Sequence, residues 1–216
     1  MSNMISTTSL VENKKMSNLT WFGVGGCSKY YFQPSSEENL ISFLKDNQLD
    51  LPIYPLGAGS NIIIRDLGFN GIIIHFNKLK EISIDEKGII NSYCGAMDAD
   101  VARFARNNSR TGLEFLIGIP GTIGGGIKMN AGCFKREFKD ILISIQALNK
   151  IGQVITIPAK EVNFKYRDSG LSEDLIFLSA SFKGFKKDKS VIENEIRLLK
   201  QKKEQAQPTK IKTSGS

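Results

Sequence analysis

Histidine and paired cysteines are scarce in this chain of 216 residues, and their scarcity excludes several kinds of site. His75 is the only histidine, so neither a histidine-based metal site nor a serine-histidine-aspartate triad is predicted. It closes an isoleucine run, which predicts the end of a strand. Cys27, Cys94 and Cys133 are odd in number and far apart, which indicates neither a disulfide framework nor a cysteine metal site. We therefore expect no metal, and we interpret the three thiols as buried or incidental.

Long apolar runs are also missing from the sequence. No run approaches the roughly 20 residues of a membrane span, and residues 1–17 lack the apolar core of a signal peptide. We expect residues 1–17 to be disordered or weakly ordered, and the protein to be cytoplasmic with no membrane partner. Hydrophobic residues make up 41% and charged residues 24% of the chain, as in globular proteins of one or two domains.

The net charge of +7 is concentrated near the C-terminus, where residues 183–212 contain ten basic and four acidic residues. Within this segment, residues 190–205 carry aliphatic residues at helical spacing. The spacing predicts an amphipathic helix that packs through Ile192, Ile196 and Leu199 and leaves its lysines in solvent. Because the segment lacks interleaved aromatic residues, we do not expect nucleic-acid binding, and a basic nucleic-acid-binding module is kept as the alternative.

Strand patterns outnumber helical patterns, which predicts an α+β fold rather than regular alternation of strands and helices. One helix is predicted through Leu40–Leu44, opened by a capping-box pattern at Ser35 and Glu38, and another over residues 98–108. The predicted strands are Ile53–Leu56, Asn61–Arg65, Gly71–Phe76 and residues 174–183, with hairpins over residues 80–94 and 144–158.

A loop of small residues, Gly57, Ala58, Gly59, Ser60 and Asn61, connects two of these strands. It is not a Rossmann loop, which needs a third glycine and a following helix, nor a P-loop, which ends in Gly-Lys-Ser/Thr. Converging backbone N–H groups and two polar side chains nevertheless suit a phosphate or pyrophosphate. A tight connection between strands, with no ligand, is the alternative.

A second stretch, residues 112–134, is even richer in glycine. Six of the nine residues from Gly118 to Gly126 are glycine or proline. Such density predicts positive φ angles or a close approach of the backbone to a bulky ligand, with a long glycine turn as the alternative. Asn130, Ala131 and Gly132 repeat the combination of a small polar residue and glycine. The two stretches together predict two surfaces for one extended ligand.

Four motifs, in this order, resemble those of the UDP-N-acetylenolpyruvoylglucosamine reductases, flavoenzymes of bacterial peptidoglycan synthesis. The motifs are TWFGVGG, LGAGSNIIIRDLGFNGIII, GLEFLIGIPGTIGGGIKMNAG and YRDSGL. The resemblance implies an α+β fold of the vanillyl-alcohol oxidase type, with two FAD-binding subdomains and a third domain that helps to hold substrate. It assigns residues 18–76 to the first subdomain, 77–190 to the second, and 191–216 to a C-terminal helix and the start of the third domain.

The resemblance implies FAD as the cofactor and NADPH as the co-substrate. The loop at Gly57 would cradle the FAD pyrophosphate, and the second stretch would line the rest of the cofactor. The implied cofactor-binding residues are Gly57, Ala58, Gly59, Ser60, Asn61, Ile119, Pro120, Gly121, Thr122, Gly124, Gly125, Gly126, Asn130, Ala131 and Gly132.

The implied reaction reduces the enolpyruvyl ether of UDP-N-acetylglucosamine to the lactyl ether of UDP-N-acetylmuramate. FAD, reduced by NADPH, supplies the hydride. Arg167 matches the family arginine beside the substrate carboxylate and enolate oxygen, where a permanent charge suits developing negative charge. Tyr166 is a second substrate-binding candidate, and Ser216 matches the family's proton donor. We expect a monomer whose partner is a UDP-sugar.

The family pattern continues beyond the serine that Ser216 matches. The domain that follows carries a catalytic glutamate, so the resemblance implies that the third, substrate domain is missing from these 216 residues. An FAD-binding fragment without turnover is therefore the alternative to an active reductase.

Overall fold

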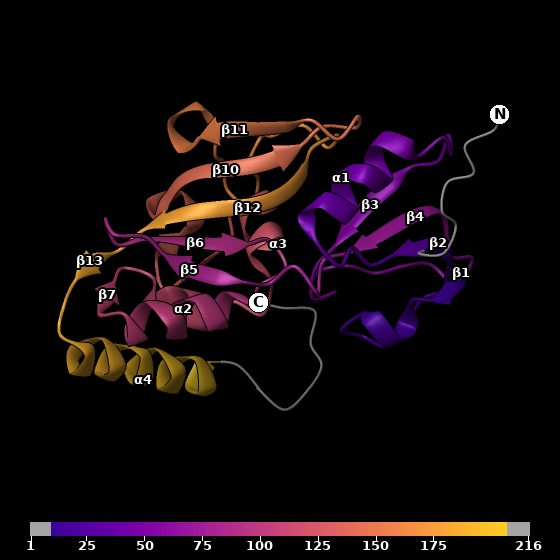
Figure 1. Ribbon diagram of the computed structural model, residues 1–216. Helices are drawn as coiled ribbons and strands as arrows, with labels where there is room; N and C mark the ends of the chain where they lie inside the picture. Colours follow the sequence, from indigo (N-terminus) through magenta and orange to yellow (C-terminus); the bar gives the residue numbers. More distant parts are fainter. Residues whose placement is uncertain (1–9, 207–216) are drawn as a thin grey trace.

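Two β-sheets organise residues 10–206, the part of the chain that the computed structural model describes (Figure 1). The first sheet has the strand order β1-β2-β4-β3, with β1 antiparallel to β2, and β4 parallel to both of its neighbours. Its strands are β1 (Leu10–Lys15), β2 (Cys27–Phe32), β3 (Ile53–Leu56) and β4 (Phe69–His75).

The second sheet is antiparallel throughout and has the order β11-β10-β12-β6-β5. Its strands are β5 (Ile82–Ile84), β6 (Ile89–Tyr93), β10 (Leu142–Leu148), β11 (Val154–Pro158) and β12 (Ile176–Lys183). Both predicted hairpins are confirmed, because β5 pairs with β6 and β10 with β11. The predicted boundary after Phe76 falls between β4 and β5.

Helices and short strands complete the described chain. The α-helices are α1 (Glu37–Asp46), α2 (Asp98–Asn107), α3 (Ile123–Lys128) and α4 (Lys189–Ala206). The 3-10 helices are η2 (Ser17–Leu19), η3 (Glu114–Gly118), η4 (Phe138–Asp140) and η5 (Ala159–Glu161). The short strands are β7 (Arg110–Thr111), β8 (Gly132–Cys133), β9 (Arg136–Glu137) and β13 (Phe185–Lys186). None of the helices within residues 10–206 is both long and apolar enough to cross a bilayer.

The helix α1 is confirmed, but its predicted capping box is wrong. Ser36, in extended backbone conformation, caps the helix by accepting a hydrogen bond from the backbone N–H of Asn39 at 3.2 Å. The side chain of Ser35 instead contacts the Asn39 Oδ1 atom. The cap therefore lies one residue later than the sequence pattern indicates.

An apolar layer joins the two sheets, and α1 lies within it (Figure 1). Leu40 and Leu44 of α1 pack in one buried cluster with Ile72 of β4, Leu148 of β10 and Leu178 of β12. A larger cluster fills the space between the second sheet, α2 and α3. The two sheets are thus held together by buried hydrophobic area, which fixes the segments that meet at their junction.

The predicted strand Asn61–Arg65 is wrong. Ile64 is buried and Ile63 is 69% exposed, which gives the alternation that predicts a strand. Within residues 10–206 this segment pairs with no strand, and the Arg65 carbonyl accepts hydrogen bonds from the Gly26 and Gly68 N–H groups. Packing against the first sheet therefore produces the burial pattern without a ladder.

The weak order predicted for residues 1–17 is wrong for residues 10–17. Strand β1 pairs with β2 from Leu10 to Lys15, and only Leu10 and Lys14 of its side chains are partly buried. A strand with so little apolar content is held by backbone hydrogen bonds, which composition does not reveal. Residues 1–9 lie outside the described residues.

Candidate functional site

The two glycine-rich segments predicted from the sequence lie against each other. A Cβ atom added to Gly57, just after β3, would collide with the side chain of Thr122, just before α3. A Cβ atom added to Gly121 would lie 3.9 Å from the Ser60 Oγ atom. The Gly57 loop lies in the first unit (residues 10–76, with the first sheet), and the Gly118–Gly126 segment lies in the second unit (residues 77–206, with the second sheet). The two thus face each other at the junction of the two sheets.

The TWFGVGG motif contacts the Gly57 loop through backbone atoms. The Trp21 backbone N–H donates to the Gly59 carbonyl at 2.9 Å. Gly59 has a φ of +66°, and a Cβ atom there would collide with the Leu19 carbonyl oxygen. Both the conformation and the close contact require glycine. Three of the four sequence motifs therefore meet at one place in the structure.

The glycine density of Gly118–Gly126 predicted either positive φ angles or a close approach of the backbone to a ligand, and the first of these explanations does not apply. None of the glycines in that segment has a positive φ. Two of them are explained by contacts within the protein, because a Cβ atom on Gly126 would collide with the Phe138 ring, and one on Gly124 would lie 3.0 Å from the Cys94 Cβ atom. Part of the glycine density therefore serves close packing of α3, which the sequence analysis did not allow for.

Gly125 differs from its neighbours in α3. A Cβ atom added there would have only the Thr122 Oγ1 atom near it, at 3.9 Å. The backbone at Gly125 consequently faces open space beside the Thr122 hydroxyl and the Gly57 loop. Among the α3 glycines, this position best fits the predicted close approach of a bulky ligand.

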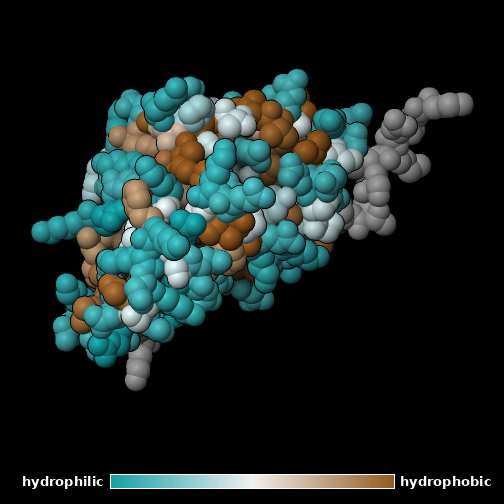
Figure 2. Space-filling model, turned by 60° about the vertical axis from the view of Figure 1, so that its left-hand side comes forward, coloured by the Kyte–Doolittle hydropathy of each residue, from teal (hydrophilic) through white to brown (hydrophobic). Residues whose placement is uncertain are grey.

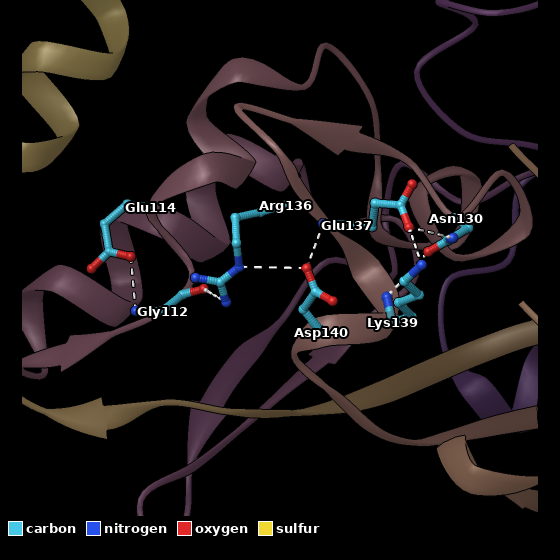
Figure 3. A network of polar contacts seen from close by, with 7 residues as sticks. All are labelled: Gly112, Glu114, Asn130, Arg136, Glu137, Lys139 and Asp140. Carbon is cyan, nitrogen blue, oxygen red and sulfur yellow. Dashed lines mark hydrogen bonds and ion pairs between the residues drawn. The ribbon is translucent and has the colours of Figure 1, made fainter. Parts of the chain in front are cut away.

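Asn130 anchors the turn that follows α3 (Figure 3). Its fully buried side chain donates to the Glu137 Oε2 atom at 3.1 Å and to the Lys165 carbonyl at 3.0 Å, and accepts from the Lys139 N–H at 3.1 Å. The neighbouring polar contacts involve Gly112, Glu114, Arg136 and Asp140. Since the amide is fully used inside the protein, a cofactor contact of Asn130 would involve its backbone.

Arg167 lies in a turn beside this anchor. Its φ is +58°, which is uncommon for a residue with a side chain. Its guanidinium contacts the Gly132 carbonyl at 3.4 Å and lies 4.9 Å from the centre of the Tyr166 ring. Tyr166 is 81% exposed. The structure therefore brings Arg167 to the glycine-rich segment and leaves Tyr166 at the surface. Ser216 lies outside the described residues.

The C-terminal helix contacts the same segment, which sequence reasoning missed. Ile192 and Ile196 are buried and Leu199 is partly buried, as the helical spacing predicts. The Lys203 ammonium, however, donates to the Gly118 carbonyl at 2.6 Å, so the prediction that all the lysines are solvated is wrong. No sequence signal links residues so far apart.

Hydrophilic residues dominate the face in Figure 2, where hydrophobic residues form separate patches.

Asp98 is the second residue that sequence reasoning missed. It begins α2, has no exposed surface, and neither of its carboxylate oxygens has a hydrogen-bond partner within residues 10–206. A Cβ atom on Gly121 would lie 3.0 Å from its Oδ2 atom. Burial raises the pKa of Asp98 well above its usual value. An acidic residue in a first helical turn is usually solvated, so the sequence did not single it out.

The single histidine and the three cysteines lie at separate places in the fold, some of them beside the glycine-rich segments. His75 ends β4, as predicted, and its Nδ1 atom is 2.7 Å from the Tyr31 hydroxyl. Burial lowers the pKa of His75. All three cysteines are free, and Cys94 is buried. Within the described residues, no cluster of histidine, cysteine, aspartate and glutamate is arranged to hold a metal ion.

Comparisons with known proteins agree with this arrangement. Residues 28–158 match a family described as FAD binding domain. A UDP-N-acetylenolpyruvoylglucosamine reductase of Pelagibacter ubique is 56% identical over 197 residues, which cover 91% of this chain and 65% of that protein. A protein of the same name from Orientia tsutsugamushi is 41% identical over 209 residues, which cover 95% of this chain and 69% of that protein.

Two solved structures resemble the chain in fold. The crystal structure of a UDP-N-acetylenolpyruvylglucosamine reductase from Thermus caldophilus is 26% identical with a TM-score of 0.79, covering 95% of this chain and 72% of that one. A berberine bridge enzyme variant is 14% identical with a TM-score of 0.62, covering 88% of this chain and 41% of that one, and supports the fold alone.

Proposed function

The chain belongs to the UDP-N-acetylenolpyruvoylglucosamine reductase family, and we propose that it binds FAD between its two glycine-rich segments to serve the reduction of UDP-N-acetylglucosamine enolpyruvate. One observation carries the proposal. The Gly57 loop and the segment before α3 meet at Thr122, beside the open backbone face of Gly125. The two subdomains have the α+β FAD-binding fold of the vanillyl-alcohol oxidase type.

The residues at this junction fit a dinucleotide. The Ser60 and Thr122 hydroxyls and the backbone of the Gly57 loop supply donors for a pyrophosphate. The Gly125 backbone leaves room for a flat group to approach. Bound FAD would supply the hydride chemistry of the reaction. The residues of the chain then have to bind and orient the cofactor and the substrate, and provide charge beside the substrate.

We propose that Arg167 binds the negatively charged carboxylate of the substrate. Its guanidinium is permanently protonated and can form two parallel hydrogen bonds with a carboxylate. The contact with the Gly132 carbonyl holds it beside the proposed cofactor segment. A fixed positive charge at this place would bind the enolpyruvyl carboxylate and stabilise negative charge on it during reduction. We propose that the exposed Tyr166 contributes to the same substrate site.

The proposal includes NADPH as reductant, a UDP-sugar as substrate, and a cytoplasmic monomer that does not bind nucleic acid. The packing of α4 supports the last point. Ile192 and Ile196 are buried against the second unit, and Lys203 bonds to Gly118. The helix is therefore occupied by intramolecular contacts on one face, and its remaining charge is distributed over an exposed surface.

An absorption spectrum and an FAD titration of the purified protein test the proposal. We expect a flavin absorption band after purification with FAD and saturable FAD binding measured by flavin fluorescence. A folded protein that neither retains nor binds FAD would reject the proposal. Tight binding of duplex DNA at physiological salt, together with no flavin binding, would support the basic module instead.

A further inference from the structure

The Asp98 carboxyl lies where the two glycine-rich segments meet. The Asp98 backbone N–H donates to the Gly121 carbonyl at 3.1 Å, and the adjacent Met97 forms a β-bridge with Thr122. The positions of the Asp98 Oδ2 and Ser60 Oγ atoms are both within 4 Å of the point that a Cβ of Gly121 would occupy. The carboxyl group is therefore fixed by its own backbone and directed at the junction of the two segments.

This carboxyl group is unusual because it is buried without a partner. It is fully buried, and both of its oxygens lack a hydrogen bond within residues 10–206. Buried polar groups in proteins nearly always have a hydrogen-bond partner, which can be a ligand. The exposed acidic residue of the same helix, Asp100, has its own partner in Arg103. The unpaired state thus belongs to Asp98 and not to the acidic turn as a whole.

The surroundings of Asp98 favour the neutral acid. Cys94, the residue after β6, is the titratable side chain that interacts with it, and burial raises the pKa of that thiol too. Ser60 and the Gly121 backbone bring no charge to the carboxyl. Within residues 10–206 no cationic side chain bonds to either oxygen, and burial therefore raises the pKa of Asp98 well above its usual range. A carboxylic acid held neutral in this way can donate a hydrogen bond.

We propose that Asp98 is a further cofactor-binding residue, whose protonated carboxyl donates a hydrogen bond to a phosphate oxygen of the bound dinucleotide. The inference rests on the FAD site proposed above. Phosphate is the group expected beside Ser60 and the Gly57 loop, and it offers only acceptors. A carboxylate would repel the phosphate, whereas the neutral acid adds a donor to those of Ser60 and the Gly57 loop. Binding of phosphate in turn disfavours ionisation of Asp98 and keeps the donor in place.

The experiment measures FAD affinity by flavin fluorescence for the unmodified chain, Asp98→Asn and Asp98→Leu, over the whole pH range in which the folded chain is stable. At the lowest pH, Asp98→Leu should bind FAD roughly 5- to 20-fold more weakly, because a donor is lost. Asp98→Asn keeps an N–H donor and should bind nearly as tightly there. The unmodified chain should lose affinity as the pH rises, and the asparagine variant should not. Asp100→Asn is the matched control on the exposed side of α2 and should behave as the unmodified chain.

Riboflavin, which carries no phosphate, identifies the group that Asp98 contacts. Its affinity should be the same for the unmodified chain and Asp98→Leu, whereas an equal loss for riboflavin and FAD would overturn the assignment. Identical pH profiles for the unmodified chain and Asp98→Asn would also overturn it, and this comparison decides the matter if Asp98→Leu does not fold. Failure of the unmodified chain to bind FAD would instead reject the cofactor site itself.

Discussion

Neighbouring glycines of α3 face different surroundings, and this difference can be tested. Replacing Gly125 by Val puts a branched side chain into the open space beside Thr122. The protein should stay folded because, apart from the backbone of α3 itself, the nearest atom to the new Cβ atom is the Thr122 Oγ1 atom, at 3.9 Å. FAD occupancy should fall, since the side chain fills the space proposed for the cofactor. Occupancy is measured as the ratio of flavin to protein absorbance, and undiminished occupancy in a folded variant would contradict the placement.

Gly126 provides the contrast one residue further on. A Cβ atom there collides with the ring of Phe138, which is itself fully buried. We expect Gly126→Ala to lower the free energy of unfolding by about 1–3 kcal/mol, because the core around the ring has no room to expand. Urea denaturation of the cofactor-free protein measures the change. Equal stability of Gly126→Ala and Gly125→Ala would show that the ring moves without cost.

The raised pKa of Asp98 also predicts a pH dependence of stability without cofactor. The folded state holds the proton more tightly than the unfolded chain, whose aspartate pKa is about 3.9. The contribution of Asp98 is therefore fully present below that pH and is lost as the pH rises through the folded-state pKa. Asp98→Asn cannot ionise, so its melting temperature should fall less than that of the unmodified protein on going to alkaline pH. Parallel melting curves across the range would contradict an ionisable, buried Asp98.

At the scale of single elements, α4 shows what a helical pattern can predict. Its aliphatic spacing predicted the buried residues Ile192 and Ile196, because one face of an amphipathic helix must pack. It could not show that Lys203 reaches the Gly118 carbonyl, since that contact depends on how the helix crosses η3. The spacing of apolar residues along a helix predicts which face is buried. The residues that each end of the helix contacts depend on tertiary packing, which the spacing does not show.

Substitutions in α4 test its packing. Ile196→Ala should lower the free energy of unfolding by about 2–4 kcal/mol, because a buried side chain is removed and the cavity is filled only in part. Leu198→Ala is the matched control, since Leu198 is 45% exposed and should change stability by less than about 0.5 kcal/mol. Chemical denaturation measures both. Similar losses for the two variants would mean that the helix is not docked by the Ile192–Ile196 face.

Strands were harder to predict than helices for a physical reason. The alternation at residues 61–65 arises from packing on the first sheet, without any ladder. Strand β1 has a ladder but almost no apolar alternation. Strand pairing depends on partners far along the chain, so local patterns mistake packed irregular segments for strands and overlook polar edge strands. The hairpins were predicted correctly because their partners are adjacent in sequence.

For the whole molecule, the site depends on the junction between two units. Motifs predicted that the Gly57 loop and the Gly118–Gly126 segment serve one ligand, and the structure brings them into contact. The apolar layer around α1, with Leu44 of the first unit against Leu148 of the second, sets that contact. A sequence shows which residues suit a phosphate, but the burial of Asp98 follows from tertiary contacts with residues far along the chain, such as Gly121.

The scale of the whole molecule also bears on turnover. We expect this 216-residue chain, with FAD bound, to oxidise NADPH in response to UDP-N-acetylglucosamine enolpyruvate far more slowly than the Pelagibacter ubique relative, of which it spans 65%. By resemblance, charge stabilisation is shared between Arg167 and a glutamate in the part of the relative that the match does not cover. Loss of one such preorganised group usually costs about 10²–10³ in rate. NADPH oxidation with and without substrate, at equal flavin concentration, gives the comparison. Arg167→Lys in the same chain should reduce any remaining substrate-dependent rate. Equal rates for the chain and the relative would show that the part of the relative outside the match is dispensable for turnover.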